Sequence, residues 1–197
     1  MTRALASRLL GAGAFVLAMI VLAGDAMVDG MLPLLGAGFA GVAPELELRT
    51  LARRPAGATE ALVAEVSIAR PVTVAGRVYR PDPRGTAWSS TPAGHVLLMP
   101  ALVAVLVLGW PAAGTREWAA RLGVAALGLP ALIALDVPVV LASGVWDLFP
   151  GAATRAGLTG VWAAFMDGGG RFAVAVLLGA AAVAAGKRFP GRRPPGR

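Results

Sequence analysis

The alternation of apolar and polar residues divides the chain into four long apolar runs and one long polar stretch. About 20 residues at 1.5 Å each cross the hydrocarbon core of a bilayer, and the third run has this length. The other three are somewhat shorter. The pattern predicts four transmembrane helices, with the polar stretch between the first two outside the membrane. The predicted spans are residues 9–24, 95–110, 122–142 and 171–186.

The composition agrees with this pattern. Hydrophobic residues make up 57% of the 197 residues and charged residues 15%, whereas soluble domains carry about 25% charged residues. Mean hydropathy is +0.71. A soluble fold of this length cannot bury so much apolar surface. The predicted class is therefore an all-α integral membrane bundle of four transmembrane helices with a small strand-containing extracytoplasmic segment.

The first apolar run has two interpretations. Arg3 and Arg8 precede it, as in a secretory signal peptide, and Val21 and Ala23 suit a cleavage after residue 23. The alternative is an uncleaved anchor. We favour the anchor because apolar character resumes in residues 31–43, which we expect to lie in the outer interface or to pack on the bundle without forming a second span.

The polar stretch, residues 25–94, is expected to be partly β. Short segments rich in β-branched residues alternate between apolar and polar positions, which is the period of a strand. Residues 58–70 are also compatible with a helix, because Glu and Ala favour helices. Residues 81–92 are rich in Pro, Gly and Ser and predict a loop. The expected strands are residues 45–51, 62–69 and 72–79.

The distribution of basic residues predicts the orientation. The N-terminus, the loop 111–121 and the tail 187–197 together carry nine basic residues and one acid. Residues 25–94 carry seven basic and seven acidic residues, and the outer loop 143–170 with the adjoining Arg171 carries two of each. Basic residues concentrate on the cytoplasmic side. We therefore expect a multi-pass protein of the bacterial inner membrane with both termini cytoplasmic.

The outer loop contains its own helical pattern. Leu158, Val161, Trp162 and Phe165 recur at the spacing of one apolar helix face. This spacing predicts a short helix lying in the membrane interface. The glycines at 168–170 are expected to end it before the last span.

Asp136 is the most unusual residue of the predicted spans, because an acid inside a membrane helix is costly and needs a partner. It lies between Pro130 and Pro138, which free backbone carbonyls near it. One interpretation is structural, with an ion pair to Arg171 that locks the third span against the fourth. The other is functional, with a site that binds a polar group, relays a proton or engages a basic residue of a partner.

Other polar residues are expected near Asp136 in the outer leaflet. His95 and Arg171 begin neighbouring spans at their outer ends, and Asp147 and Asp167 flank the outer loop. The candidate polar cluster is therefore Asp136, Arg171, His95, Asp147 and Asp167.

The sequence excludes several kinds of chemistry. The chain has no cysteine and one histidine, so it has no thiol nucleophile, no Cys-ligated metal and no multi-histidine metal site of its own. Residues 167–171 (DGGGR) do not match a nucleotide-binding loop. Ser89 and Ser90 near His95 lack a nucleophile-elbow motif. We expect no catalytic residue, no cofactor and no metal.

The formal charge of +7 does not indicate nucleic-acid binding. The basic residues lie mostly beside the predicted spans, and no nucleic-acid-binding motif is present. The expected partners are membrane lipids and either another membrane protein or a second copy of the chain.

The layout of one N-terminal span, a strand-like outer segment that begins at Pro44, and three further spans starting at His95, Leu122 and Arg171 resembles the small membrane proteins associated with exosortase-type protein-sorting systems. The resemblance covers the architecture of most of the chain and no specific motif. It implies an accessory role, since the Cys nucleophile of sorting transpeptidases is missing.

The predicted function is thus a non-catalytic accessory or assembly subunit of an inner-membrane complex. It would contact its partner through the extracytoplasmic segment and the polar cluster. The alternative is a small transport or proton-coupled component that uses Asp136, and an enzyme is a third interpretation.

Overall fold

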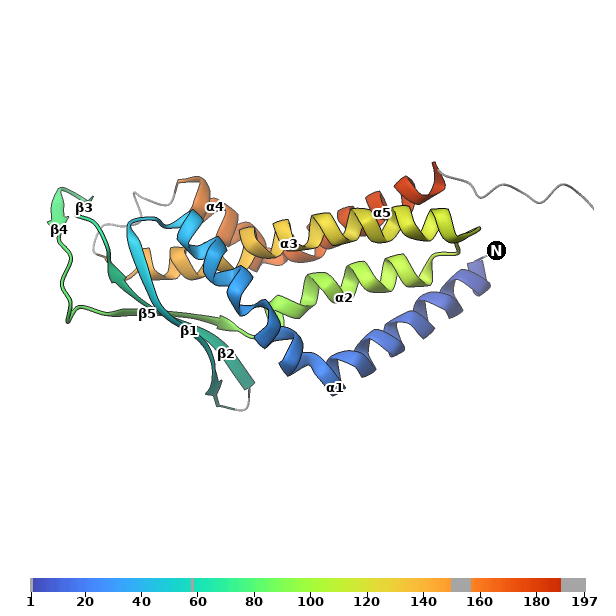
Figure 1. Cartoon of the computed structure of the whole chain (residues 1–197), viewed down its shortest axis with the longest axis horizontal. Helices are drawn as coiled ribbons and strands as arrows, with labels where there is room; N and C mark the ends of the chain where they lie inside the picture. Colours follow the sequence, from blue (N-terminus) through green and yellow to red (C-terminus); the bar gives the residue numbers. More distant parts are fainter. Residues whose placement is uncertain (1, 58, 150–156, 189–197) are drawn as a thin grey trace, which may run out of the picture. The chain divides into compact units, whose positions relative to one another are not determined.

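The computed structural model describes residues 2–57, 59–149 and 157–188 and is mostly helical (Figure 1). Three helical stretches in this part of the chain are long and apolar enough to cross a membrane: Arg3–Val42, Thr115–Trp146 and Leu158–Lys187. The fourth apolar helix, Gly94–Gly109, has 16 residues and is shorter. The elements are α1 (Thr2–Val42), β1 (Leu46–Ala56), β2 (Thr59–Ile68), β3 (Val72–Val74), β4 (Arg77–Tyr79), β5 (Ala87–Pro92), α2 (Gly94–Gly109), α3 (Thr115–Trp146), α4 (Leu158–Phe165), η2 (Met166–Gly170) and α5 (Arg171–Lys187).

The chain divides into two compact units. Of the described residues, unit 1 comprises 2–24, 98–131 and 171–188. Unit 2 comprises 25–57, 59–97, 132–149 and 157–170. The long helices α1 and α3 therefore contribute to both units. Each unit is described separately below.

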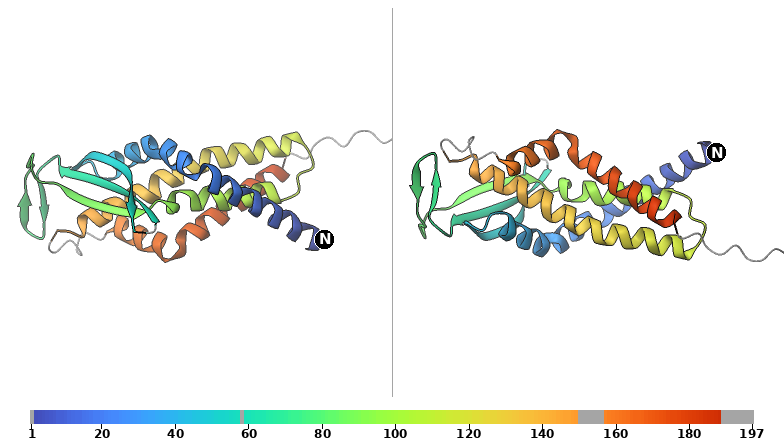
Figure 2. Two further views of the ribbon diagram at one scale, coloured as in Figure 1. Left: turned by 90° about the horizontal axis from the view of Figure 1, so that it is seen from below. Right: turned by 90° about the horizontal axis from the view of Figure 1, so that it is seen from above.

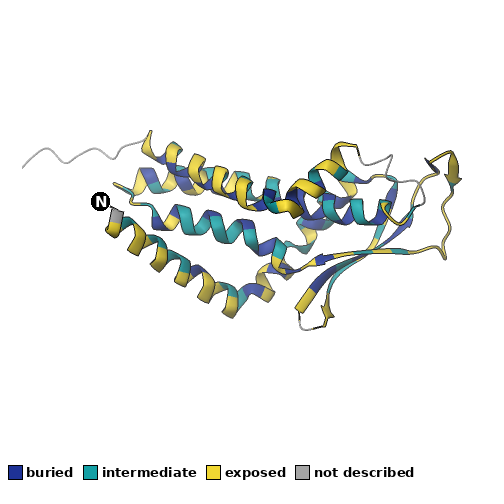
Figure 3. Cartoon of the chain, turned by 180° about the vertical axis from the view of Figure 1, so that it is seen from behind, coloured by how far each residue is buried: buried dark blue, intermediate teal, exposed yellow. Residues whose placement is uncertain are grey.

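Unit 1 consists of helices whose outward faces are apolar. Glycines allow the helices to pack closely: a Cβ on Gly109 would lie 2.6 Å from Leu9, and one on Gly179 would lie 2.6 Å from Leu106. Small residues at contacts of this kind are typical of membrane helices. Figure 3 shows exposed positions along these helices. The exposed residues of unit 1 with large apolar side chains include Leu10, Phe15, Leu17, Leu22, Leu127, Phe172 and Leu177.

Unit 2 contains a three-stranded antiparallel sheet in the order β1-β2-β5. The alternation of buried Leu62, Ala64 and Val66 along β2 defines its inner face. The outer part of α1 contacts this face, where Gly36 lies against Leu48, and α3 contacts it where Gly144 lies against Ser89. The views in Figure 2 show these helical segments beside the sheet.

A separate two-stranded hairpin, β3-β4, packs against the end of α3. Its turn residues Ala75 and Gly76 have φ values of 47° and 77°, as a tight type I′ hairpin turn requires. The buried side chains of Val72 and Val74 contact Trp146 among other residues. The core of the hairpin is completed by Ile68, Tyr79 and Phe149.

Several sequence predictions are confirmed as secondary structure. The helices expected at 95–110 and 171–186 are α2 and α5, and the short helix expected at 158–165 is α4. The glycine run breaks the helix as expected, because Gly169 has a non-helical φ of 104°. The strands expected at 45–51 and 62–69 are β1 and β2, which excludes the helical alternative for this segment.

Other predictions are wrong. The first helix does not end at residue 24 but continues to Val42, because Val28, Leu35 and Phe39 form one buried helical stripe. The expected strand 72–79 is a hairpin, and part of the expected loop 81–92 is the strand β5. The segment 111–121 is a loop only in part, because α3 begins at Thr115. This helix extends to Trp146 and contains the whole of the expected span 122–142.

Candidate functional site: a polar cavity beside the sheet edge

The principal polar site of unit 2 is a cavity of about 410 Å³ between β5, α3, α4 and η2. Its lining includes Ser89 and Ser90 of the strand, Ser143 of α3 and Thr159 of α4. These side chains lie at the cavity because β5 and α3 are in contact at Gly144, where a Cβ would lie too close to the Ser89 hydroxyl. Hydroxyl-bearing residues of three elements therefore meet at this cavity.

Two of the five predicted cluster residues line this cavity. Asp147 lies just beyond the end of α3, and Asp167 lies in η2. Carboxylates and hydroxyls accept hydrogen bonds from an ammonium or guanidinium group. Among the described residues, no group of three or more His, Asp or Glu side chains could hold a metal ion. The two carboxylates and the hydroxyl-bearing residues of the wall are acceptors that suit a cationic side chain.

Asp136 lies on the same face of α3 as the cavity. Val140, Ser143 and Asp147 line the cavity and follow Asp136 by four, seven and eleven residues, which is the spacing of one helix face. The Asp136 side chain is fully buried. Asp136 thus lies along α3 from the cavity, about three helical turns before Asp147.

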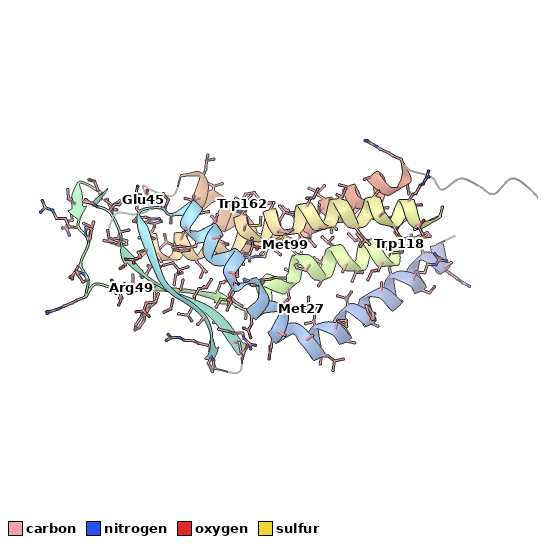
Figure 4. All side chains as sticks on the ribbon, in the orientation of Figure 1. Met27, Glu45, Arg49, Met99, Trp118 and Trp162 are labelled. Atoms are coloured by element: carbon pink, nitrogen blue, oxygen red, sulfur yellow. The ribbon has the colours of Figure 1, made fainter. Side chains whose placement is uncertain are left out.

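The backbone of α3 near Asp136 is opened by Pro138, which cannot donate to the carbonyl of Ala134. The adjacent carbonyl of Leu135 accepts a hydrogen bond of 2.9 Å from the indole N–H of Trp162, which is labelled in Figure 4. Gly38 of α1 approaches the Ala134 carbonyl so closely that a Cβ there would lie 2.8 Å from the oxygen. Both α1 and α4 are thereby joined to this segment of α3.

The remaining two predicted residues have other surroundings. His95 is half-buried at the start of α2, and its Nδ1 lies 3.1 Å from the hydroxyl of Thr91. Arg171 is buried at the start of α5 in unit 1, whereas Asp136 belongs to unit 2. Their pairing stays a prediction. Asp147 and Asp167 are the two cluster residues that share a cavity.

A second cavity of unit 2, of about 620 Å³, lies at the other end of β5. Its lining includes the aromatic residues Tyr79, Trp88 and Phe149. Leu148 and Phe149 follow the end of α3. Its rim carries Arg80 and Asp82. The Asp82 carboxylate accepts a hydrogen bond of 2.9 Å from the Arg84 backbone N–H, which orders the rim loop. Sequence reasoning missed this cavity because it depends on the unpredicted strand β5.

Unit 1 contains a buried ion pair that sequence reasoning also missed. Arg121 is completely buried and pairs with Glu117 one turn earlier on α3. It donates hydrogen bonds of 2.7 Å to the carbonyl of Trp110 and 2.8 Å to that of Pro111, which follow the end of α2. Glu117 accepts a 2.8 Å bond from the backbone N–H of Ala113. The pair therefore satisfies the backbone groups of the α2–α3 turn.

A surface ion cluster in unit 2 joins α1 to the sheet. The guanidinium of Arg53 in β1 lies 2.5 Å from Asp25, 3.3 Å from Asp29 and 2.6 Å from Glu60. Burial disfavours its charged form, but the three carboxylates outweigh this effect and raise the pKa of Arg53 above its ordinary value. Arg53 therefore stays charged, and the acids of α1 remain directed toward β1.

The described part of the chain is thus a mostly helical protein with three helices of membrane-spanning length and a small strand-containing part. Comparisons with protein-family models, with curated proteins and with solved structures find no match. Function is therefore argued from the geometry of the cavities and surfaces.

Proposed function

We propose that the protein is a non-catalytic accessory or assembly subunit of a bacterial inner-membrane complex. The apolar faces of unit 1 are suited to contact with lipid, since exposed surface of this extent and character is unusual for a soluble protein. In this proposal α2 is a fourth span despite its 16 residues, and both termini are cytoplasmic, as the basic residues favour. The resemblance to the accessory proteins of exosortase-type systems belongs to the same proposal.

One observation carries the assignment of unit 2 to partner binding. An edge strand, β5, contributes to two cavities of different character, one apolar and aromatic, the other lined with hydroxyls and carboxylates. Apolar cavities with a few polar groups are typical binding sites. Trp88 contributes to the first cavity and is 65% exposed, as is suitable for a residue that a partner covers.

Affinity purification under mild detergent is the experiment that tests this proposal. A tagged chain is expected to recover a second membrane protein in constant proportion, and Trp88→Ala is expected to lower that recovery severalfold. Phe172→Ala is the matched control, because Phe172 is an exposed aromatic residue of the lipid-suited face of unit 1. Recovery of this chain alone in every mild detergent would contradict the accessory role.

A second candidate function, transport or proton coupling through Asp136, is favoured by the position of this buried carboxylate on the cavity-lining face of α3. In this case Asp136→Asn should abolish pH-driven flux in proteoliposomes while leaving the unfolding temperature almost unchanged. Asp147→Asn, on the exposed wall of the same cavity, is the comparison variant. Unchanged flux in the Asp136→Asn variant would exclude proton coupling through Asp136.

A further inference from the structure

Among the residues that the structure describes, no strand pairs with the side of β5 that faces away from β2, so this edge of the sheet is open. Its register with β2 pairs Thr91 with Leu62 and Ser89 with Ala64. The backbone N–H of Ala93 donates a hydrogen bond of 2.9 Å to the backbone carbonyl of Glu60. This bond shows which residue pairs of the β2–β5 ladder are hydrogen-bonded and which are not. In an antiparallel ladder, hydrogen-bonded and non-hydrogen-bonded pairs alternate.

It follows that the odd-numbered residues of β5 bond to β2, and the even-numbered residues direct their backbone groups away from it. The outward groups are the N–H and C=O of Trp88, the N–H and C=O of Ser90, and the C=O of Pro92. All three residues are exposed. The open edge therefore presents a short row of donors and acceptors to an incoming strand.

The two cavities of unit 2 meet this edge two residues apart. Ala87 and Trp88 line the apolar cavity, while Ser89 and Ser90 line the polar cavity that contains Asp147. Side chains on one face of a strand recur every second residue. A strand added to β5 would place one side chain at the apolar cavity and another, two positions away, at the carboxylate of Asp147.

We propose that the open edge of β5 binds an extended segment of a partner protein by strand addition, with an apolar and a basic side chain two positions apart. This inference rests on the accessory function proposed above and names its binding edge. Main-chain hydrogen bonds supply affinity in such additions, and the side-chain pockets supply specificity. The basic residue forms a charge-assisted hydrogen bond with Asp147.

A second copy of the chain is a poorer occupant of the edge. The segment it would offer at its own open edge, AWSSTP, contains no basic residue to meet Asp147. The strand is also short and ends in Pro92, two features that limit pairing between identical edges. A separate partner with a basic residue fits the site better.

Binding of labelled peptides to the full chain in phosphatidylcholine nanodiscs tests the proposal. The probes are the fluorescein-labelled peptides acetyl-Thr-Phe-Thr-Arg-Thr-Val-amide and, for the opposite strand direction, acetyl-Val-Thr-Arg-Thr-Phe-Thr-amide. One of them is expected to give a saturable rise in fluorescence anisotropy. The same peptide with alternate backbone nitrogens methylated should bind at least about tenfold more weakly, because strand pairing is lost.

Variants of the chain test each contact separately. Ser90→Pro should reduce binding at least about tenfold without loss of fold, since the Ser90 N–H is not used by β2. Ser89→Pro is the control for damage to the sheet, because the Ser89 N–H belongs to the ladder with Ala64. Asp147→Asn should weaken the Arg peptide about tenfold and leave a Gln-for-Arg peptide unchanged.

The outcomes separate this inference from the accessory function. Equal binding of the methylated and unmethylated peptides, or no binding of either, contradicts strand addition. If Ser90→Pro still recovers the second membrane protein, the edge is wrong and the accessory role stands. The proposal would also be overturned if the chain bound neither peptide but associated with itself, and if Ser90→Pro abolished this self-association. That result would show that a second copy of the chain occupies the edge.

Discussion

Replacing Arg121 with alanine is expected to lower the free energy of unfolding by about 3–5 kcal/mol, because it leaves the buried carboxylate of Glu117 without its partner. The substitution also removes the donors to the carbonyls of Trp110 and Pro111 at the end of α2. The loss should appear as a lower midpoint of denaturant-induced unfolding in detergent micelles. Tryptophan fluorescence can follow it, since the Arg121 guanidinium lies 5.6 Å from the ring of Trp118.

The control for Arg121 is Arg116 on the same helix. Arg116 is exposed, and its replacement with alanine should change stability by less than about 0.5 kcal/mol. The double variant Glu117→Leu with Arg121→Met removes both buried charges and should be more stable than Arg121→Ala alone. Equal effects of Arg121→Ala and Arg116→Ala would show that the buried pair does not stabilise unit 1.

Gly38→Ala is expected to destabilise unit 2 by about 1–3 kcal/mol, although alanine is normally the better helix former. The added Cβ would lie 2.8 Å from the carbonyl oxygen of Ala134 and 2.9 Å from the ring of Pro138. A backbone oxygen cannot rotate away as a flexible side chain does, so α1 must move from α3. The measurement is again the unfolding midpoint in detergent.

Gly30→Ala is the matched control, because it makes the same chemical change in the same helix. Apart from the neighbouring residues and the nearby backbone of the same helix, no atom lies within 4 Å of the Cβ position at Gly30. This variant should be more stable than the parent chain by about 0.5–1 kcal/mol, since alanine loses less backbone entropy than glycine. If Gly38→Ala and Gly30→Ala both raised, or both lowered, the unfolding midpoint, this result would contradict a close contact of α1 and α3 at Gly38.

The helices that the sequence predicts correctly are those whose evidence is local. The runs that form α2 and α5 are apolar after their first residues, His95 and Arg171. The face of Leu158, Val161, Trp162 and Phe165 that predicts α4 repeats with the helical period. The extension of α1 was missed because Asp25, Asp29 and Pro33 interrupt its apolar character. Its buried stripe becomes evident only once helix and sheet are packed together.

The strand β5 and the cavities beside it could not be predicted, because the segment AWSSTP has weak strand preference and lies in a Pro- and Ser-rich region. Its pairing with β2 is a tertiary effect. The clustering of Asp147 and Asp167 depends on the same pairing. The pair of Glu117 and Arg121 has a local signal, which is the spacing of four residues on one helix. The signal is lost when the segment 111–121 is predicted as a loop, because this spacing brings two side chains together only in a helix.

The irregularity in β1 limits how the sheet can grow. A register shift between Leu48 and Thr50 interrupts the ladder opposite β2, and Arg53 is held by Asp25 and Asp29 of α1. Bulges and charges of this kind blunt a strand against further pairing. Within the described residues, the sheet thus has a single side, that of β5, to which a strand can be added. Strand addition would consequently stop at one partner per chain, and open-ended filaments, which need two complementary surfaces, would not form.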